Sequence, residues 1–176
     1  SIELGRISGE VEARTAGGSI EIAEGGERVM ANTAGGSIRI RRSSGTVDAH
    51  TAGGSIELGP SGGDVELRTA GGSIRIEASG GRVRAETAGG SISVDGSNGP
   101  VDVRTAGGSL TISQAHGAID ARTSGGSIEA ELVVSDSGLN TTCNLETAGG
   151  DVTISLPSDL AATIDAEIRV RDRDSG

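Results

Sequence analysis

The chain repeats one hexapeptide, Thr-Ala-Gly-Gly-Ser-Ile, at a fixed spacing. Exact copies begin at Thr15, Thr33, Thr51, Thr69 and Thr87, and the variants TAGGSL, TSGGSI and TAGGDV begin at Thr105, Thr123 and Thr147. The first seven copies start 18 residues apart, and the eighth follows after 24 residues. A fixed period of this size is typical of a solenoid, in which each coil buries its apolar face by stacking on its neighbours.

The alternation of apolar and polar residues predicts two short strands in each coil. In the coil that starts at Thr33, Ile38 and Ile40 alternate with arginines, and Val47 and Ala49 alternate with polar residues. This period of two is typical of a strand with one buried face. The same parity points Thr51 inward. Serine- and glycine-rich segments connect the strands and are expected to form turns.

Stacking these coils places like residues in inward ladders and predicts a thin aliphatic core. The first strand supplies Ile20, Ile38, Ile56, Ile74, Ile92, Leu110 and Ile128, and the second supplies Val11, Val29, Val47, Val65, Val83, Val101 and Ile119. The chain of 176 residues has no Phe, Tyr or Trp, which suits a narrow core. At ~4.8 Å per rung, about nine rungs would give a rod about 40 Å long.

We therefore predict an all-β fold, a single-domain parallel β-solenoid that spans residues 1–176. The general rule for parallel crossovers favours a right-handed coil, although solenoids with 18-residue coils include left-handed examples. The chain starts within a repeat and ends in a charged stretch, so we interpret it as a segment of a longer protein.

The glycine pairs are expected to form tight turns in which positive φ requires glycine. A phosphate-binding loop would occur once, before a helix, and would contain a lysine. These pairs instead recur in every coil and precede strands, and the chain has no lysine. A calcium-binding nonapeptide is equally disfavoured because no aspartate recurs beside the glycines.

Charged residues occupy the outward positions with alternating sign. Glu21, Arg39, Glu57 and Arg75 form one such ladder, which is expected to help set the register of the coils. The net charge is −10, which argues against a nucleic-acid partner because that binding depends on clustered cations. Neither strand face suggests a cofactor.

The period breaks between Thr123 and Thr147, where the coil at 131–146 is six residues longer. Irregular loops on a rigid framework commonly carry function, so this coil is the candidate for partner contact. The candidate contact residues are Val133, Val134, Asp136, Leu139 and Asn140. Within the same coil Cys143 takes the usual valine place and Leu145 the usual alanine place. We expect Cys143 to be a buried and inert core residue.

Catalytic and metal-binding patterns are not evident in the sequence. His50 and His116 lie on different coils, so they are expected to be solvated and not to share a metal ion. No Gly-x-Ser-x-Gly motif occurs in a strand-to-helix setting. A polysaccharide-acting solenoid would be expected to use aromatic side chains, and an ice-binding one would expose the recurrent threonines that the parity turns inward. We therefore expect no enzyme activity, no cofactor and no metal.

Two stretches resemble a bacterial family of domains of unknown function that is described as adhesin-like. They are TSGGSIEAELVV, at 123–134, and CNLETAGGDVTISLPSDLAATIDAE, at 143–167. The resemblance implies a parallel β-solenoid on a bacterial envelope-associated or extracellular protein, and it brings no catalytic residues with it. The leading hypothesis is a structural scaffold or adhesin-like module that contacts an unknown protein or cell-surface partner. The alternative is an element that self-associates end to end through its open strand edges.

Overall fold

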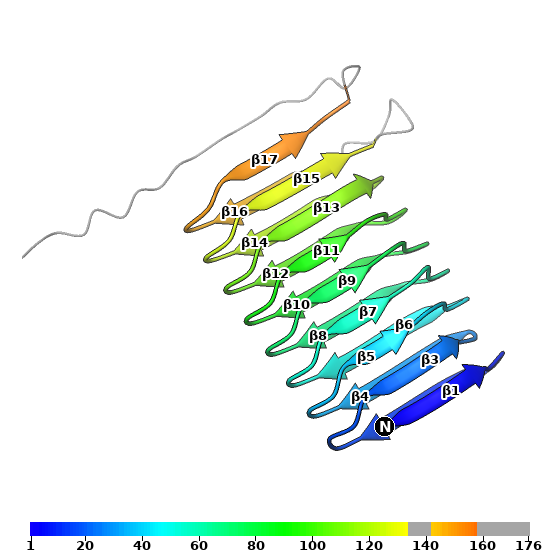
Figure 1. Ribbon diagram of the computed structural model, residues 1–176. Coiled ribbons are helices and arrows are strands. Elements are labelled where there is room, and N and C mark those ends of the chain that lie inside the picture. Colours follow the sequence, from blue (N-terminus) through cyan, green and yellow to red (C-terminus); the bar gives the residue numbers. More distant parts are fainter. Residues whose placement is uncertain (134–141, 158–176) are drawn as a thin grey trace, which may run out of the picture.

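The computed structural model describes residues 1–133 and 142–157, and these residues form two parallel β-sheets joined into a solenoid (Figure 1). The nine-stranded sheet consists of β1 (Ile2–Arg6), β3 (Ile20–Glu24), β5 (Ile38–Ile40), β7 (Ile56–Leu58), β9 (Ile74–Ile76), β11 (Ile92–Val94), β13 (Leu110–Ala115), β15 (Ile128–Leu132) and β17 (Val152–Ser155). The eight-stranded sheet consists of β2 (Glu10–Thr15), β4 (Arg28–Thr33), β6 (Thr46–Thr51), β8 (Val65–Thr69), β10 (Val83–Thr87), β12 (Val101–Thr105), β14 (Ile119–Thr123) and β16 (Cys143–Thr147).

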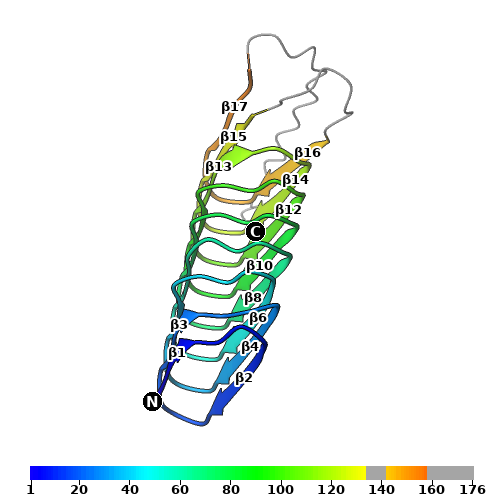
Figure 2. The same ribbon diagram turned by 90° about the vertical axis from the view of Figure 1, so that its right-hand side faces the viewer.

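Successive coils stack in register, so each strand pairs with the strand one coil away. Ile38 lies opposite Ile20 on one side and Ile56 on the other. The two sheets face each other and consecutive strands alternate between them, as the view from the side shows (Figure 2). The prediction of an all-β parallel solenoid with 18-residue coils is confirmed, over about seven turns. The total of about nine rungs and the right-handed sense of the coil stay predictions.

The core is the thin aliphatic layer that the ladders predict. Ile20, Ile38, Ile56 and Ile74 are each no more than 1% exposed. The facing sheet contributes valines and alanines, which are buried to a similar extent. Large side chains thus pack against small ones, and β-branched residues fit the pleated surface of both sheets.

The structure adds a third inward column, in a segment that was expected to form a turn. Isolated parallel bridges connect Gly25, Ser43, Ser61, Ser79, Ser97 and Ala115 in consecutive coils. The four serines are buried, and their hydroxyls donate to backbone carbonyls, as from Ser61 Oγ to Gly45 O at 2.9 Å. Polar side chains can occupy this position because each one finds an acceptor within the coil stack.

The threonines of the hexapeptide point inward, as predicted, and bond to the backbone of the corner. The hydroxyl of Thr69 donates to the carbonyl of Gly54 in the preceding coil at 2.7 Å. It also accepts from the N–H of Gly72 in its own coil at 3.3 Å. The same pair of bonds recurs for the threonines at 33, 51, 87, 105 and 123.

The prediction that the glycine pairs require positive φ is wrong. No glycine among the described residues has a positive φ. The second glycine is required because the corners of successive coils approach closely: a Cβ on Gly72 would lie closer than 3.0 Å to the carbonyl oxygen of Gly54. A Cβ on the first glycine of that pair, Gly71, would lie 3.2 Å from the carbonyl oxygen of Gly53, a tight contact that a shift of a few tenths of an ångström would relieve.

The regular stack changes after β13, before the longer coil. The pairing of β13 with β15 shifts between Ile112 and Ala115, and the intervening Gln114 has a φ of 49°. A residue in this conformation within a register shift is typical of a β-bulge. Beyond the longer coil the register resumes, because Cys143 lies opposite Ile119 and Leu145 opposite Ala121.

The position predicted for Cys143 is thus confirmed, but its predicted burial is wrong. Its side chain is half-buried. The reason is its place in the sheet, since β16 pairs with β14 and no other described strand stacks on it.

Candidate functional site

The outer face of the nine-stranded sheet carries the predicted ladder of alternating charge. Glu21, Arg39, Glu57 and Arg75 lie opposite one another in consecutive coils. Arg39 Nε donates to Glu57 Oε2 at 2.6 Å. This hydrogen bond and the charge of Glu57 raise the pKa of the exposed Arg39 above its ordinary value. Arg39 therefore stays charged throughout the physiological range.

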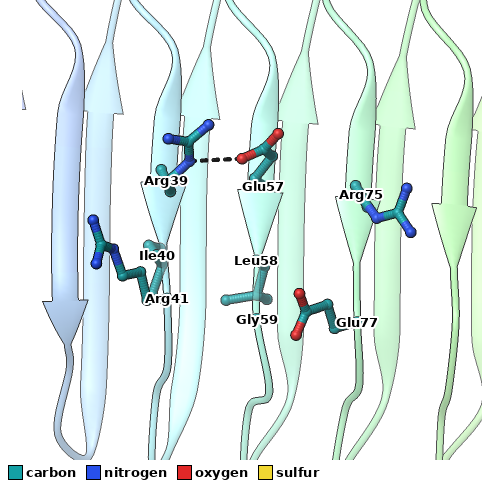
Figure 3. A pocket seen from close by; sticks show the side chains of 8 residues that line it. All are labelled: Arg39, Ile40, Arg41, Glu57, Leu58, Gly59, Arg75 and Glu77. Atoms are coloured by element: carbon teal, nitrogen blue, oxygen red, sulfur yellow. Dashed lines mark hydrogen bonds and ion pairs between the residues drawn. The ribbon is translucent and has the colours of Figure 1, made fainter.

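A shallow groove of about 450 Å³ opens on this face where Gly59 takes the place of a longer side chain. Its floor is formed by Leu58 and Gly59, and its walls are Arg41 on one side and Glu77 on the other (Figure 3). Gly59 cannot carry a side chain because a Cβ would lie closer than 3.0 Å to the carbonyl oxygen of Arg41. The groove is therefore a consequence of close coil stacking.

The charged groups around the groove are mostly paired with neighbours. Arg41 is turned toward Glu21, with Nη2 to Oε1 at 2.5 Å, and Arg75 Nη2 lies 3.0 Å from Asp95 Oδ2. Glu77 makes no ion pair with any described residue, and its carboxylate is directed toward Gly59 (Figure 3). The groove could thus accept a cationic group at Glu77, but its exposed, mutually neutralised ions offer weak binding.

The outer face of the eight-stranded sheet is ordered in a different way. Two of its outward columns run along the rod. The first outer column is Glu12, Met30, Asp48, Glu66, Arg84, Asp102, Asp120 and Asn144, and the second outer column is Arg14, Asn32, His50, Arg68, Glu86, Arg104, Arg122 and Glu146.

The first outer column is mainly acidic and the second mainly basic, so ion pairs form along the strands. Arg122 Nε lies 3.0 Å from Asp120 Oδ1, and Arg104 Nη2 lies 3.3 Å from Asp102 Oδ1. Among the described strands β10 reverses the order, with Arg84 in the first column and Glu86 in the second, and β16 departs from it with Asn144 and Glu146. This pattern is not among the expectations drawn from the sequence, where its signal is opposite charge two residues apart in the second strand of most coils.

The candidate partner-contact residues lie largely beyond what the structure describes. Val134, Asp136, Leu139 and Asn140 are outside the described residues. Val133 is half-buried, and its N–H donates to the carbonyl of Ala115 at 2.8 Å. This bond ties the start of the longer coil to the bulged corner of β13.

The two histidines lie in different surroundings. His50 is exposed on the second outer column, as predicted. His116 is half-buried, which corrects the prediction that it is solvated, and its Nδ1 lies 3.2 Å from the carbonyl oxygen of Ser97.

Metal-ligand clusters and membrane-spanning helices are both absent from the described ranges, 1–133 and 142–157. No cluster of three or more His, Cys, Asp or Glu side chains there could hold a metal ion. No helix there has the length and apolar character needed to cross a membrane.

Comparison with known proteins identifies a family but no individual relative. The sequence model described as Toastrack DUF4097 matches residues 37–172, about three quarters of the chain. No curated protein and no solved structure matches the chain. The expected resemblance to a family of unknown function is therefore confirmed, without its adhesin-like description. With its stacked 18-residue coils and this match, the chain belongs to the Toastrack family, a family of domains of unknown function.

Proposed function

We propose that the chain is a non-enzymatic, rigid β-solenoid scaffold, an adhesin-like module of a bacterial envelope-associated or extracellular protein. In this role the rod holds a contact surface at a fixed distance and orientation, and it needs no cofactor, metal or nucleic acid. The right-handed coil and the count of about nine rungs belong to the same proposal. They are supported by the crossover rule and by the nine and eight strands in the two sheets.

The proposal rests mainly on the hydrogen bonds that the repeated polar side chains form between coils. Threonine hydroxyls bond inward to corner carbonyls, as described above for Thr69. The serine hydroxyls accept from the next coil, as Ser55 Oγ does from the N–H of Ser73 at 3.2 Å. The groups that recur in every coil thus hold coils together. This pattern favours a framework over a repeated binding or catalytic site.

The longer coil is the proposed place of contact with a protein or cell-surface partner. It interrupts a repeat that is otherwise regular from Thr15 to Thr123. The sequence there combines Val133, Val134 and Leu139 with polar residues. A few well-placed side chains can supply most of the affinity of an interface.

The proposal is tested with beads coated with the chain and applied to intact bacterial cells. The variant replaces residues 134–140 by a glycine–serine linker of equal length, and the matched control replaces the exposed Arg75 by Ser. We expect the coated beads to bind cells, the linker variant to bind about tenfold less tightly, and the control to bind normally. Binding no better than that of albumin-coated beads would contradict the proposal, as would equal binding by the linker variant.

End-to-end association is the second candidate function. Among the described strands β1 pairs only with β3, and no described strand lies along its other edge. Such an edge is a template for another strand. Light scattering should then detect rods that lengthen with concentration, and a proline-bearing cap before Ser1 should abolish them. A particle size independent of concentration would exclude this alternative.

A further inference from the structure

On the outer face of the eight-stranded sheet, acids and arginines form pairs that lie along the strands in a mostly consistent direction. In β2, β8, β12 and β14 an acid in the first outer column is followed two residues later by an arginine in the second. In β10 the order is reversed. These side chains stay between 29% and 69% exposed despite their pairing. The face therefore keeps charge available to an outside partner.

We propose that this face docks a second copy of the same chain, with the two rods side by side, parallel and without stagger. The relevant symmetry is a twofold axis that runs parallel to the rods between the two faces. It reverses the direction of each strand but leaves each coil at its own height. The first outer column of one copy then lies over the second outer column of the other, as in an isologous interface.

In this arrangement the acid of each charged strand lies opposite the arginine of the same strand in the second copy. Asp120 lies opposite Arg122 of the second copy, and Asp102 lies opposite Arg104 of the second copy. The reversed strand fits as well, because Arg84 then lies opposite Glu86 of the second copy. Sheets that pack face to face are about 10 Å apart. At this distance arginine and carboxylate side chains can meet between the two faces.

The reversal at β10 opposes slippage of the two rods. A shift of one coil would place Glu66 opposite Glu86 and Arg84 opposite Arg104. The shift would also place Arg68 opposite Arg84. Like charges brought together across an interface oppose association. The single reversed strand therefore selects the unstaggered register.

The same columns oppose an antiparallel arrangement of the rods. A twofold axis that runs along the strands would place the first outer column over itself with the coil order inverted, and an axis midway between β12 and β14 would then bring Asp102 of one copy against Asp120 of the other. The described strands of the nine-stranded sheet lack acid–arginine pairs within a strand. Its ion pairs run between coils, as from Arg41 to Glu21 and from Arg39 to Glu57. The docking face is thus the eight-stranded sheet, and its partner is a parallel copy.

The test uses charge reversal in the complete 176-residue chain. The acidic variant carries Arg104→Glu and Arg122→Glu, and the basic variant carries Asp102→Arg and Asp120→Arg. Sedimentation equilibrium should show that the unmodified chain dimerises at low ionic strength. High salt should weaken the dimer, because the screening length falls from about 10 Å at 0.1 M to about 3 Å at 1 M. Each variant alone should dimerise at least tenfold less tightly, whereas an equimolar mixture of the two should dimerise.

A third variant is the control for the case in which the other two variants misfold. It exchanges the charges within β12 and β14, with D102R, R104D, D120R and R122D, so every ion pair along a strand is kept. It should dimerise with itself as tightly as the unmodified chain and should not pair with the unmodified chain. Circular dichroism checks that it is folded.

Three results would overturn the proposal. They are an unmodified chain that stays monomeric at high concentration and low salt, acidic and basic variants that associate as well as the unmodified chain, and an exchanged variant that pairs freely with the unmodified chain. The design also separates lateral docking from end-to-end association, because reversing charges on the face leaves the strand edges of the terminal coils unchanged.

Discussion

At the scale of single residues, the repeated hexapeptide is shaped by contacts between coils. Its threonine joins two coils through one hydroxyl, and its serine accepts an N–H from the next coil. The second glycine passes against the carbonyl of the coil below, where a Cβ does not fit. The first glycine has slightly more room. The two glycines therefore look alike in the sequence but are under different constraints.

This difference predicts unequal effects of alanine at the two positions. Gly72→Ala should lower the free energy of unfolding by about 2 kcal/mol or more, because the corner must shift to relieve a backbone clash. Gly71→Ala should cost less than about 1 kcal/mol, since movement by a few tenths of an ångström relieves its contact with Gly53 O. Urea unfolding of both variants measures the difference. Equal losses would contradict the assignment of the close contact.

Cys143 predicts how stability depends on alkaline pH. Burial raises the pKa of its thiol, and a hydrogen bond with the backbone of Ile119 partly opposes this. The folded chain therefore holds the proton more tightly than the unfolded chain. Its contribution to stability is complete below the ordinary thiol pKa of about 8.5 and is lost as the pH rises through the higher folded value.

The measurement compares the unmodified chain with Cys143→Val in urea titrations at increasing pH. The chain has no lysine and no tyrosine, so Cys143 is the only side chain with an ordinary pKa between about 8 and 10. The unmodified chain should lose more stability than the variant over this interval. Parallel pH profiles would show that the thiol has the same pKa in the folded and unfolded chains.

At the scale of elements, β13 marks the transition from regular to irregular coils. Gln114 occupies the bulge that separates Ile112 from Ala115 in the pairing with β15. Its φ of 49° lies in the left-handed region, where residues with a side chain are disfavoured. The next coil reaches the inward column one residue earlier, through Leu132 opposite Ala115. The bulge thus adjusts the register immediately before the longer coil.

This geometry predicts opposite effects of glycine at two adjacent residues. Gln114→Gly should raise the free energy of unfolding by about 0.5–1 kcal/mol, because glycine adopts positive φ without steric strain. Gln114→Val should lower it by about 1–2 kcal/mol. Ser113→Gly is the matched control and should lower it by up to about 1 kcal/mol, since glycine weakens a strand interior. Thermal unfolding distinguishes these signs, and a loss at both glycine variants would argue against the bulge.

At the scale of the whole molecule, the rod is a stack in which each coil contacts its neighbours. Strand pairs one coil apart account for the sheet contacts, as between β8 and β10. Such a molecule has approximately one-dimensional energetics, in which stability is a sum over coils and their interfaces. Its length can therefore change by whole coils without altering the interior.

This property predicts that an in-phase deletion is tolerated and an out-of-phase deletion is not. Removing residues 48–65 joins Val47 to Glu66 and restores a complete coil, so the variant should stay folded with a β-rich circular dichroism spectrum. Removing residues 48–64 leaves one additional residue within the strand and turns part of its apolar side chains outward. That variant should lose cooperative unfolding. Similar behaviour of the two variants would contradict a strict 18-residue register.

Much of the fold could be predicted from the sequence because one period carries most of the information. Alternation within a strand decides which face a residue takes, and the 18-residue repeat places Ile38 over Ile20 without any other knowledge. The same reasoning placed Cys143 in the valine ladder across a coil of different length. The candidate contact residues followed only from the break in the period, which gives their position in the chain and not their geometry.

The tertiary structure alone decided what happens between coils. It identified the second glycine as the close contact, turned the serine column at Ser61 inward and left Cys143 half-buried at the last described strand of its sheet. It also directed Arg41 to Glu21, a carboxylate that is not its direct neighbour in the ladder. The physical reason is that periodicity determines the direction of a side chain. Steric fit, burial and ion pairing depend on distances to the neighbouring coil, which exist only once the coils have stacked.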